Sequence, residues 1–419
     1  MNTEQYLLYL LKTFISQEEE VLPPPAGVSL KELYESGQKH NVAAMLYGVL
    51  RQAGLENEAL SEFREAMVGA VYWSTVMDSM VSDVAGQLET AGIPYTVLKG
   101  YRLKETYPVP ELRTMGDVDF LIREADRNDA DRLLLEAGYE REPLGGSTWV
   151  YKQAGVTLEF HTKLASGDYW NEVDYEGYFL QYFSRLQPVE GCSERRLRPE
   201  EHFIFLLFHL AKHLNSSGAG IRMVLDLAVF LKKYQDSMDW EFIRKELAGI
   251  RLQDFAEHIL SLCGALFLDG RGEDPNIREQ DADAGTAGRE QKGTDGRQVP
   301  ESDPLQRQLL SYIMQGGIFG FERPDSIRRL RGGIGAGNVS GDKRIRAKAA
   351  LKLMFPGRKH MVAFLPALEH HPWLLPVAWI RRWRMGMQQR ERVEASLSGF
   401  RENVDEAREQ YFLLKKIGL

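Results

Sequence analysis

The sequence is poor in cysteine and has no long uninterrupted apolar segment. Two cysteines, Cys192 and Cys263, occur among 419 residues. This is too few for a disulfide scaffold and favours a reducing compartment, so we expect a cytoplasmic protein. No apolar run reaches the roughly 18 to 20 residues that a membrane-spanning helix needs, and the first residues lack the pattern of a cleaved signal peptide. We therefore expect no transmembrane segment, and we do not expect a secreted, collagenous or fully disordered protein.

The chain as a whole also lacks a strong charge of either sign. The 52 basic and 60 acidic side chains give a net charge of −8, and the hydrophobic fraction of 43% is typical of globular proteins. Residues 322–360 differ from this average, because 11 Lys and Arg against 3 acidic residues give them a local net charge of +8. This basic segment suits an RNA backbone, an anionic polysaccharide or a membrane surface, or it is a solvated charged face. The sequence does not indicate an oligomeric state.

Apolar patterning predicts a small sheet between helical regions. Residues 1–92 show helical spacing, interrupted by three consecutive prolines. Residues 93–190 contain four short apolar or alternating runs that predict strands, and residues 124–139 between the second and third runs have helical spacing closed by Gly138. The predicted strands are 93–100, 117–122, 148–153 and 156–164. We therefore expect an α+β fold, in which a small mixed sheet is flanked by N-terminal and C-terminal helical regions.

The remainder of the chain is predicted to be helical apart from one insertion. Residues 191–269 have helical spacing and predict a helical domain. Residues 270–304 are dense in Gly, Asp, Glu and Arg, and they are too polar to offset the entropy of ordering, so they predict a disordered insertion. Residues 305–419 return to helical patterning and contain most of the basic segment. The glycine string at 331–341 follows no strand, so it predicts a flexible loop rather than a dinucleotide-binding turn.

Acidic residues are concentrated in two of the predicted strands. Asp117 and Asp119 are two residues apart in the second strand, so both carboxylates project from one face. Glu159 adds a third carboxylate if the fourth strand lies beside the second. Three clustered carboxylates repel one another unless a cation lies between them, and oxygen ligands of this kind favour Mg²⁺ or Mn²⁺. Two such ions assist phosphoryl or nucleotidyl transfer; the alternative is a solvated polar face.

Basic residues near these acids are suited to binding phosphate. Lys99 and Gly100 end the first predicted strand. Glycine there lets backbone N–H groups approach a phosphate, and the ammonium group neutralises its charge. Arg113 is able to bind phosphate through two parallel hydrogen bonds. The alternatives are a surface lysine before a turn, and an ion pair of Arg113 with Asp117 or Glu111.

Four polar residues interrupt two otherwise apolar helical segments. His209 and His213 are four residues apart on one predicted helix, and Arg222 and Asp226 have the same spacing on the next. Three interpretations are open for this group. It forms a zinc site with an open water position, it faces a nucleotide with Arg222 held by Asp226, or it is structural, with a buried salt bridge and hydrogen-bonded histidines.

The order of several short motifs resembles the uncharacterised nucleotidyltransferase family of the polymerase-β-type nucleotidyltransferase superfamily. The motifs are Leu98-Lys99-Gly100, Tyr107, Arg113, Asp117-x-Asp119, Gly138-Tyr139 and Glu159-x-His161. The similarity extends over most of the chain through HLAKHL at 209–214, IRMVLDLA at 221–228 and the tryptophan-containing C-terminal part. The superfamily usually has Gly-Ser where this chain has Lys99-Gly100, a form that also resembles nucleotidyltransferases of abortive-infection toxin systems.

The resemblance implies a nucleotidyltransferase that moves a nucleoside monophosphate from an NTP to an acceptor and releases pyrophosphate by a two-metal mechanism with Mg²⁺ or Mn²⁺. It implies that Asp117, Asp119 and Glu159 are the catalytic residues and the metal ligands. The substrate-binding residues that it implies are Lys99, Gly100, Arg113, His161, His209, His213, Arg222 and Asp226. The acceptor is a small molecule, a sugar, a protein or RNA. Two alternatives stay open, a toxin-like transferase acting on tRNA and a catalytically silent scaffold that binds a nucleotide or a partner.

Overall fold

The structure is a computed structural model, and it describes nine segments of the chain: residues 1–142, 148–165, 169–268, 303–317, 320, 324–334, 341–362, 365–387 and 403–419. The chain divides into two compact units. The first consists of Met1–Ala211, Ala219–Ile318 and Gly418, and the second of Lys212–Gly218, Phe319–Ile417 and Leu419. Within the described segments, no helix combines the length and the apolar character that crossing a membrane requires.

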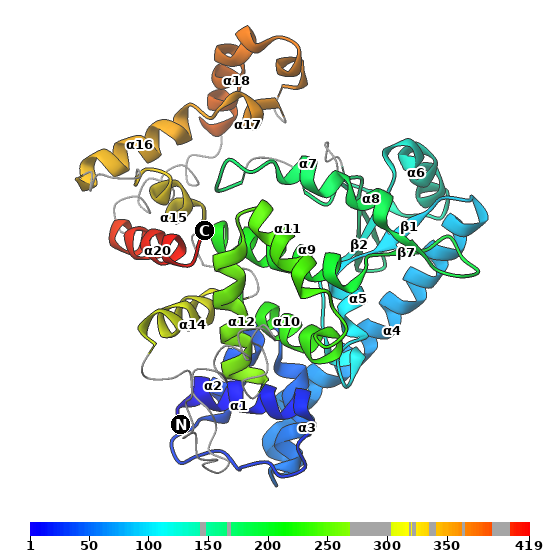
Figure 1. Ribbon diagram of the computed structural model, residues 1–419, viewed down its shortest axis with the longest axis vertical. Coiled ribbons are helices and arrows are strands. Elements are labelled where there is room, and N and C mark those ends of the chain that lie inside the picture. Colours follow the sequence, from blue (N-terminus) through cyan, green and yellow to red (C-terminus); the bar gives the residue numbers. More distant parts are fainter. Residues whose placement is uncertain are drawn as a thin grey trace. The chain divides into compact units, whose positions relative to one another are not determined.

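Helices fill the N-terminal part of the first unit, as the apolar spacing of residues 1–92 predicts. They are α1 (Thr3–Ser16), α2 (Leu30–Lys39), α3 (Ala43–Gln52), the short 3₁₀ turn η1 (Asn57–Leu60) and α4 (Ser61–Thr90). A capping box starts α1, because the Asn2 side chain accepts a hydrogen bond from the Gln5 backbone while the Gln5 side chain accepts one from the Asn2 backbone. The long helix α4 then leads directly to the sheet (Figure 1).

A five-stranded mixed sheet forms the centre of the first unit. Its strands are β1 (Tyr95–Val97), β2 (Val118–Ile122), β3 (Glu140–Arg141), β4 (Thr148–Gln153) and β5 (Val156–His161). They lie in the order β1-β2-β5-β4-β3; β2 and β5 run parallel, and the other neighbours are antiparallel. The predicted fold class, α+β with a small mixed sheet flanked by helices, is confirmed.

Two details at the ends of the strands differ from the prediction. Lys99 and Gly100 do not end a strand, because β1 stops at Val97 and helix α5 (Lys99–Lys104) begins at Lys99. The backbone of Lys99 has a φ of 44°, in the left-handed region, which turns the chain sharply from strand into helix. Asp117 lies immediately before β2 rather than within it.

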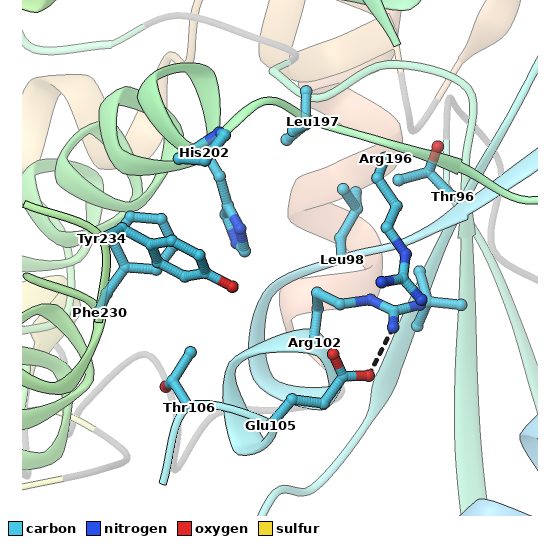
Figure 2. A pocket seen from close by; sticks show the side chains of 12 residues that line it. Thr96, Leu98, Arg102, Glu105, Thr106, Arg196, Leu197, His202, Phe230 and Tyr234 are labelled. Carbon is cyan, nitrogen blue, oxygen red and sulfur yellow. Dashed lines mark hydrogen bonds and ion pairs between the residues drawn. The ribbon is translucent and has the colours of Figure 1, made fainter. Parts of the chain in front are cut away.

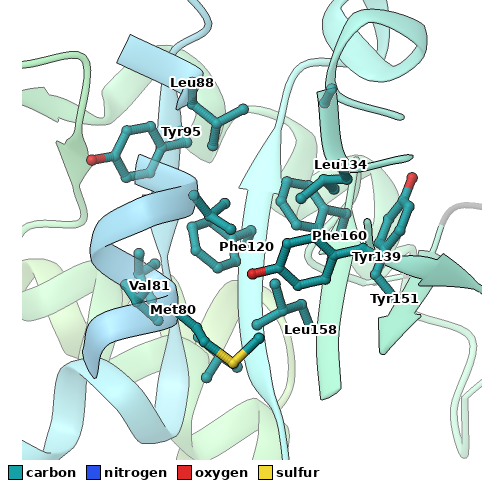
Figure 3. Close-up of a cluster of buried hydrophobic side chains, with 14 of the residues drawn as sticks. Met80, Val81, Leu88, Tyr95, Phe120, Leu134, Tyr139, Tyr151, Leu158 and Phe160 are labelled. Atoms are coloured by element: carbon teal, nitrogen blue, oxygen red, sulfur yellow. The ribbon is translucent and has the colours of Figure 1, made fainter. Parts of the chain in front are cut away.

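Helices α4 and α6 (Arg127–Glu136) cover one face of the sheet. Figure 3 shows the buried side chains of this face, with Met80 and Val81 from α4 packed toward the strands. The rings of Phe120 on β2 and Phe160 on β5 are stacked with centroids 4.9 Å apart. This apolar layer takes up every second side chain of β2 and β5, so the residues between them project from the opposite face.

Further helices complete the first unit. Between β2 and α6 lies the 3₁₀ turn η3 (Glu124–Asp126), and η2 (Pro110–Leu112) precedes β2. The later elements are α7 (Tyr175–Leu180), α8 (Tyr182–Arg185), the paired strands β6 (Gln187–Pro188) and β7 (Arg195–Arg196), α9 (Pro199–Asn215), α10 (Ile221–Tyr234), α11 (Trp240–Gly249), α12 (Gln253–Phe267) and α14 (Pro304–Gly316). Most of the predicted insertion at 270–304 lies outside the described residues; Asp303 caps α14.

The second unit is helical where it is described. Its elements are α15 (Pro324–Arg331), α16 (Asp342–Met354), α17 (Arg358–Val362), the 3₁₀ turns η4 (Pro366–Glu369) and η5 (Pro372–Leu374), α18 (Leu375–Met387) and α20 (Val404–Lys416). Side chains of α15, α16 and α20 share one apolar core. Trp379 and Trp383 of α18 donate hydrogen bonds to the carbonyls of Pro356 and Met354. Residues 335–340 of the glycine string lie outside the described residues.

Candidate active site

The pairing of β2 with β5 brings acidic residues together on the face opposite the apolar layer. Asp119 is aligned with Glu159, and Leu121 with His161. The sequence predicts that Asp119 and Glu159 share a face only if β2 and β5 are neighbours in the sheet. The structure shows that these two strands are paired. Because side chains alternate along a strand, Asp119, Glu159 and His161 all project from the same face.

Asp119 is the centre of a compact polar cluster. It is only 4% exposed. One of its oxygens, Oδ1, lies 2.7 Å from Lys99 Nζ and 2.7 Å from His161 Nε2. The same histidine nitrogen is 3.3 Å from Glu159 Oε2. The other ring nitrogen of His161, Nδ1, lies 3.0 Å from the hydroxyl of Thr148 on β4, which fixes the orientation of the ring.

The electrostatic environment differs between the two aspartates. Burial by itself would raise the pKa of Asp119, but Lys99 and His161 hold that pKa well below its usual range. Desolvation within the site raises the pKa of Asp117, although part of the side chain reaches solvent, and the charges of Asp119 and Glu159 raise it further. The charges of the three carboxylates are therefore coupled to one another.

One group of side chains is arranged to hold a cation. Asp119, Glu159 and His161 each offer a ligand atom, and these atoms lie within 4.8 Å of one another. Across the described part of the chain this is the one group of three or more such residues, and neither His209 nor His213 belongs to it. The family resemblance implies that His161 binds the substrate rather than the cation. Asp117 lies outside the group but close enough for its charge to be coupled to Asp119 and Glu159.

A buried ion pair lies next to this cluster, and it differs from the pairs that the sequence predicts for Arg113 and Asp226. Arg113 binds Asp226 on α10 through two hydrogen bonds, Nε to Oδ1 at 3.0 Å and Nη2 to Oδ2 at 2.7 Å. The hydroxyl of Tyr107 donates to the same carboxylate at 2.7 Å. The predicted pairing of Asp226 with Arg222 is therefore wrong, and so is the alternative pairing of Arg113 with Asp117 or Glu111.

The Arg113 side chain also explains why glycine follows Lys99. A Cβ atom placed on Gly100 would overlap with Nη1 of Arg113. Arg113 is 5% exposed and held by Asp226 at its other two nitrogens, so it has little freedom to move away. The prediction attributes this glycine to the approach of a phosphate; the structure adds a packing reason.

Arg222 of α10 projects toward the acidic cluster from the helical side. Its Nη1 donates to the Thr114 carbonyl at 2.7 Å, while its Nε is buried and has no hydrogen-bond partner among the described residues. Burial, followed by the nearby charge of Arg113, lowers the pKa of Arg222 to about 10, and the charges of Asp226 and, less strongly, Asp117 act in the opposite direction. Arg222 is thus a largely buried cation that faces an acidic site.

Two residues of the predicted site remain, and two contacts of the site carry no predicted role. His209 and His213 lie on α9, and the ring centroid of His209 is 6.3 Å from that of Phe205. Thr148 and Tyr107 were assigned no role from the sequence, although both contact a site residue. Strand alternation in β4 is a signal for Thr148, since it faces His161 in the register. No local signal joins Tyr107 to Asp226, which is 119 residues away.

Comparison with known proteins places the chain in a family. No curated protein matches it. Among solved structures, two of ANT(2'')-Ia are similar: a crystal structure in complex with adenylyl-2''-tobramycin and a solution structure of this antibiotic-resistance factor. They are 10% and 11% identical, cover 42% of this chain and 97% and 92% of their own chains, and have TM-scores of 0.32. The profile of the uncharacterised nucleotidyltransferase family matches residues 27–268, more than half of the sequence, and the chain belongs to that family.

Proposed function

We propose that this protein transfers a nucleoside monophosphate from an NTP to a hydroxyl or phosphate of an acceptor, with release of pyrophosphate and in dependence on Mg²⁺ or Mn²⁺. The observation that carries the proposal is the alignment of Asp119 with Glu159 on one sheet face, with Lys99 beside them. Family membership supports the same reaction class. Nucleotidyl transfer needs little covalent chemistry from the protein and depends on charged groups held in position around the reacting phosphate. The sheet face with Asp119 and Glu159 supplies such groups.

The donor set fits a divalent cation. Asp117, Asp119 and Glu159 are the proposed ligands, and His161 supplies a further nitrogen in reach of two of them. Desolvation and then the charges of Asp119 and Glu159 raise the pKa of Asp117, and a cation bound to these carboxylates would relieve their mutual repulsion. When bound, such a cation would stabilise the charge that develops on the phosphate and acceptor oxygens. We propose that Glu159 also accepts the proton of the acceptor hydroxyl.

Two basic side chains of the protein, Lys99 and Arg222, are suited to binding the triphosphate of the NTP. Lys99 Nζ presently neutralises Asp119, and we propose that it turns to a phosphate oxygen when a divalent cation takes over that carboxylate. Arg222 is the second candidate, because its buried Nε has no partner among the described residues. Arg113 has a positioning role in this proposal: Asp226 holds it beneath Gly100, at the first turn of α5. We assign no step to His209 or His213.

The direct test is incubation with each labelled NTP and Mn²⁺ in cell extract, followed by mass spectrometry of the small-molecule, protein and RNA fractions. The double variant Asp117→Ala, Asp119→Ala should lose transfer by at least about 100-fold while keeping its circular dichroism spectrum. Asp129→Asn is a matched control, since this aspartate lies on the solvent-exposed side of α6 and should leave transfer unchanged.

Two outcomes would contradict the proposal. Full activity of the double variant would remove the acidic site from the mechanism. Binding of NTP and Mg²⁺ without pyrophosphate release against every fraction would favour a catalytically silent scaffold. A label found on tRNA alone would keep the reaction class but select the toxin-like alternative.

A further inference from the structure

A pocket opens beside the acidic site. Residues of β1, α5, β7, α9 and α10 line this pocket, which is partly open to solvent. Leu98 lines this pocket and donates its backbone N–H to the Asp119 carbonyl at 2.9 Å, while the next residue, Lys99, binds the Asp119 carboxylate. Two consecutive residues, Leu98 and Lys99, therefore connect the pocket to the acidic site. A molecule in the pocket would lie next to the acidic residues.

One wall of the pocket is aromatic and carries unused polar atoms. Figure 2 shows the ring of His202 and the hydroxyl of Tyr234 pointing into the space, with Phe230 behind them. His202 and Phe230 are in edge contact, with centroids 5.2 Å apart. His202 is 9% exposed, and its Nε2 has no hydrogen-bond partner within the described segments. A buried ring nitrogen that faces a cavity without a partner is the expected feature of a ligand site.

The opposite wall is polar but electrically balanced. Arg102 contacts two carboxylates, Glu105 at 2.5 Å and Glu194. Arg196 contacts Glu194 through two nitrogens, each at 3.2 Å. The two guanidinium groups of this wall are thus paired with two carboxylates, Glu105 in the wall and Glu194 outside the lining, and the group of four has no net charge. The Nε of Arg102 is buried and, like His202 Nε2, has no partner in the described part of the chain.

Together, these two walls favour an uncharged ligand. An anion would have to compete with Glu105 and Glu194 for guanidinium groups that are already paired, and an amine would have to compete with Arg102 and Arg196 for carboxylates that are already paired. Burial, followed by the charge of Arg102, lowers the pKa of His202 to about 4, so the imidazole is neutral at pH 7. An uncharged ring with hydroxyl groups satisfies both walls, because its C–H face packs on the aromatic side chains and its hydroxyls bond to the unpaired nitrogens.

We propose that this pocket binds the acceptor, and that the acceptor presents an uncharged ring with several hydroxyl groups, such as a monosaccharide or cyclitol unit. The assignment of the bound molecule as acceptor rests on the proposed nucleotidyltransferase function. A hydroxyl of the ring would then be the nucleophile: its oxygen bonds to the α-phosphorus of the NTP, the bond from that phosphorus to the pyrophosphate oxygen breaks, and the hydroxyl proton passes to Glu159.

Saturation-transfer NMR on the full-length protein without NTP tests the pocket. The neutral probes are methyl α-glucopyranoside and myo-inositol, and the charged probes are glucose 6-phosphate and glucosamine. We expect the neutral probes to bind more tightly than the charged ones in wild type and in Asp119→Asn. Tyr234→Phe and His202→Leu should each weaken binding roughly tenfold, because each removes a polar group from the pocket wall. Tyr72→Phe, at a 60% exposed tyrosine outside the pocket, is the matched control.

The results separate this inference from the proposed function. Failure of both neutral probes to bind, tighter binding of a charged probe, or unchanged binding in Tyr234→Phe would overturn the pocket assignment, even if Asp119-dependent pyrophosphate release is observed. Binding of neutral probes that Tyr234→Phe weakens would support the pocket. If no NTP then yields pyrophosphate, the proposed function fails while the binding site stands.

Discussion

Lys99 and Gly100 are consecutive residues that the structure requires for different reasons. Lys99 has a left-handed backbone and places its ammonium group on Asp119, where it neutralises a buried carboxylate. Backbone strain of this kind is commonly found at functional sites. Gly100 is required for another reason, the proximity of Arg113. The sequence reveals the Lys-Gly motif but not the reason for its glycine, because Arg113 lies 13 residues further along the chain.

A pair of glycine substitutions tests the packing explanation. Gly86 lies within α4 and Gly100 in the first turn of α5, so helix propensity gives no reason for alanine to destabilise either position. No atom lies within 4 Å of a Cβ on Gly86, whereas a Cβ on Gly100 meets Arg113. We expect Gly100→Ala to lower the free energy of unfolding by about 1–3 kcal/mol and Gly86→Ala to raise it by about 0.5–1 kcal/mol, measured by urea denaturation. Equal effects of the two substitutions would show that Arg113 moves away freely.

At the scale of elements, the pair of Arg113 and Asp226 joins the loop before β2 to helix α10. The strands and their alternation were predictable, because apolar residues at every second position determine which face is buried. The partners of the buried charges were not predictable, since a local pattern carries no information about a side chain 113 residues away. Spacing of four residues suggests Arg222 as the partner of Asp226, but the actual pair joins Arg113, directly after η2, to Asp226 within α10.

Removal of one partner of this pair should be costly. Asp226→Asn leaves the buried guanidinium of Arg113 without a counter-charge, so we expect a loss of roughly 3–5 kcal/mol in the free energy of unfolding by urea denaturation. The control is Asp129→Asn, which removes an aspartate paired with Arg132 at a position where both side chains are more than half exposed. That substitution should change stability by less than about 1 kcal/mol. A small effect of Asp226→Asn would mean that water reaches Arg113.

The same pair predicts a dependence on pH. Burial raises the pKa of Asp226, but Arg113 outweighs burial and holds it below the ordinary value. The folded state therefore binds fewer protons at this site than the unfolded state, and the stabilisation is complete above the unfolded pKa of about 4. It is lost as the pH falls through the lower folded pKa. The unfolding free energies of wild type and Asp226→Asn should converge below pH 4, and a constant difference down to pH 2 would contradict this cause.

On the scale of the whole molecule, charge is distributed very unevenly. The net charge of −8 combines +8 in residues 322–360 with −16 in the rest of the sequence. All of the proposed catalytic residues lie in the first compact unit, and the described part of the basic segment lies in the second. The composition predicts a globular chain, but the net charge of the whole sequence does not reveal the acidic site or the basic segment. Their separation indicates which unit a divalent cation should stabilise.

A cation bound to the folded acidic site stabilises the unit that contains it by mass action. At a concentration 100 times its dissociation constant this amounts to about 2.7 kcal/mol, or a rise of roughly 5 °C in the unfolding temperature of a unit this large. Calorimetry of the full chain with Mn²⁺ should show the shift in wild type and not in Asp119→Asn, whereas Asp129→Asn should behave as wild type. Because two compact units need not unfold together, a transition of the second unit should remain in place. An equal shift in Asp119→Asn would mean that Mn²⁺ binds elsewhere on the molecule, and the acidic face would lose its role as the metal site.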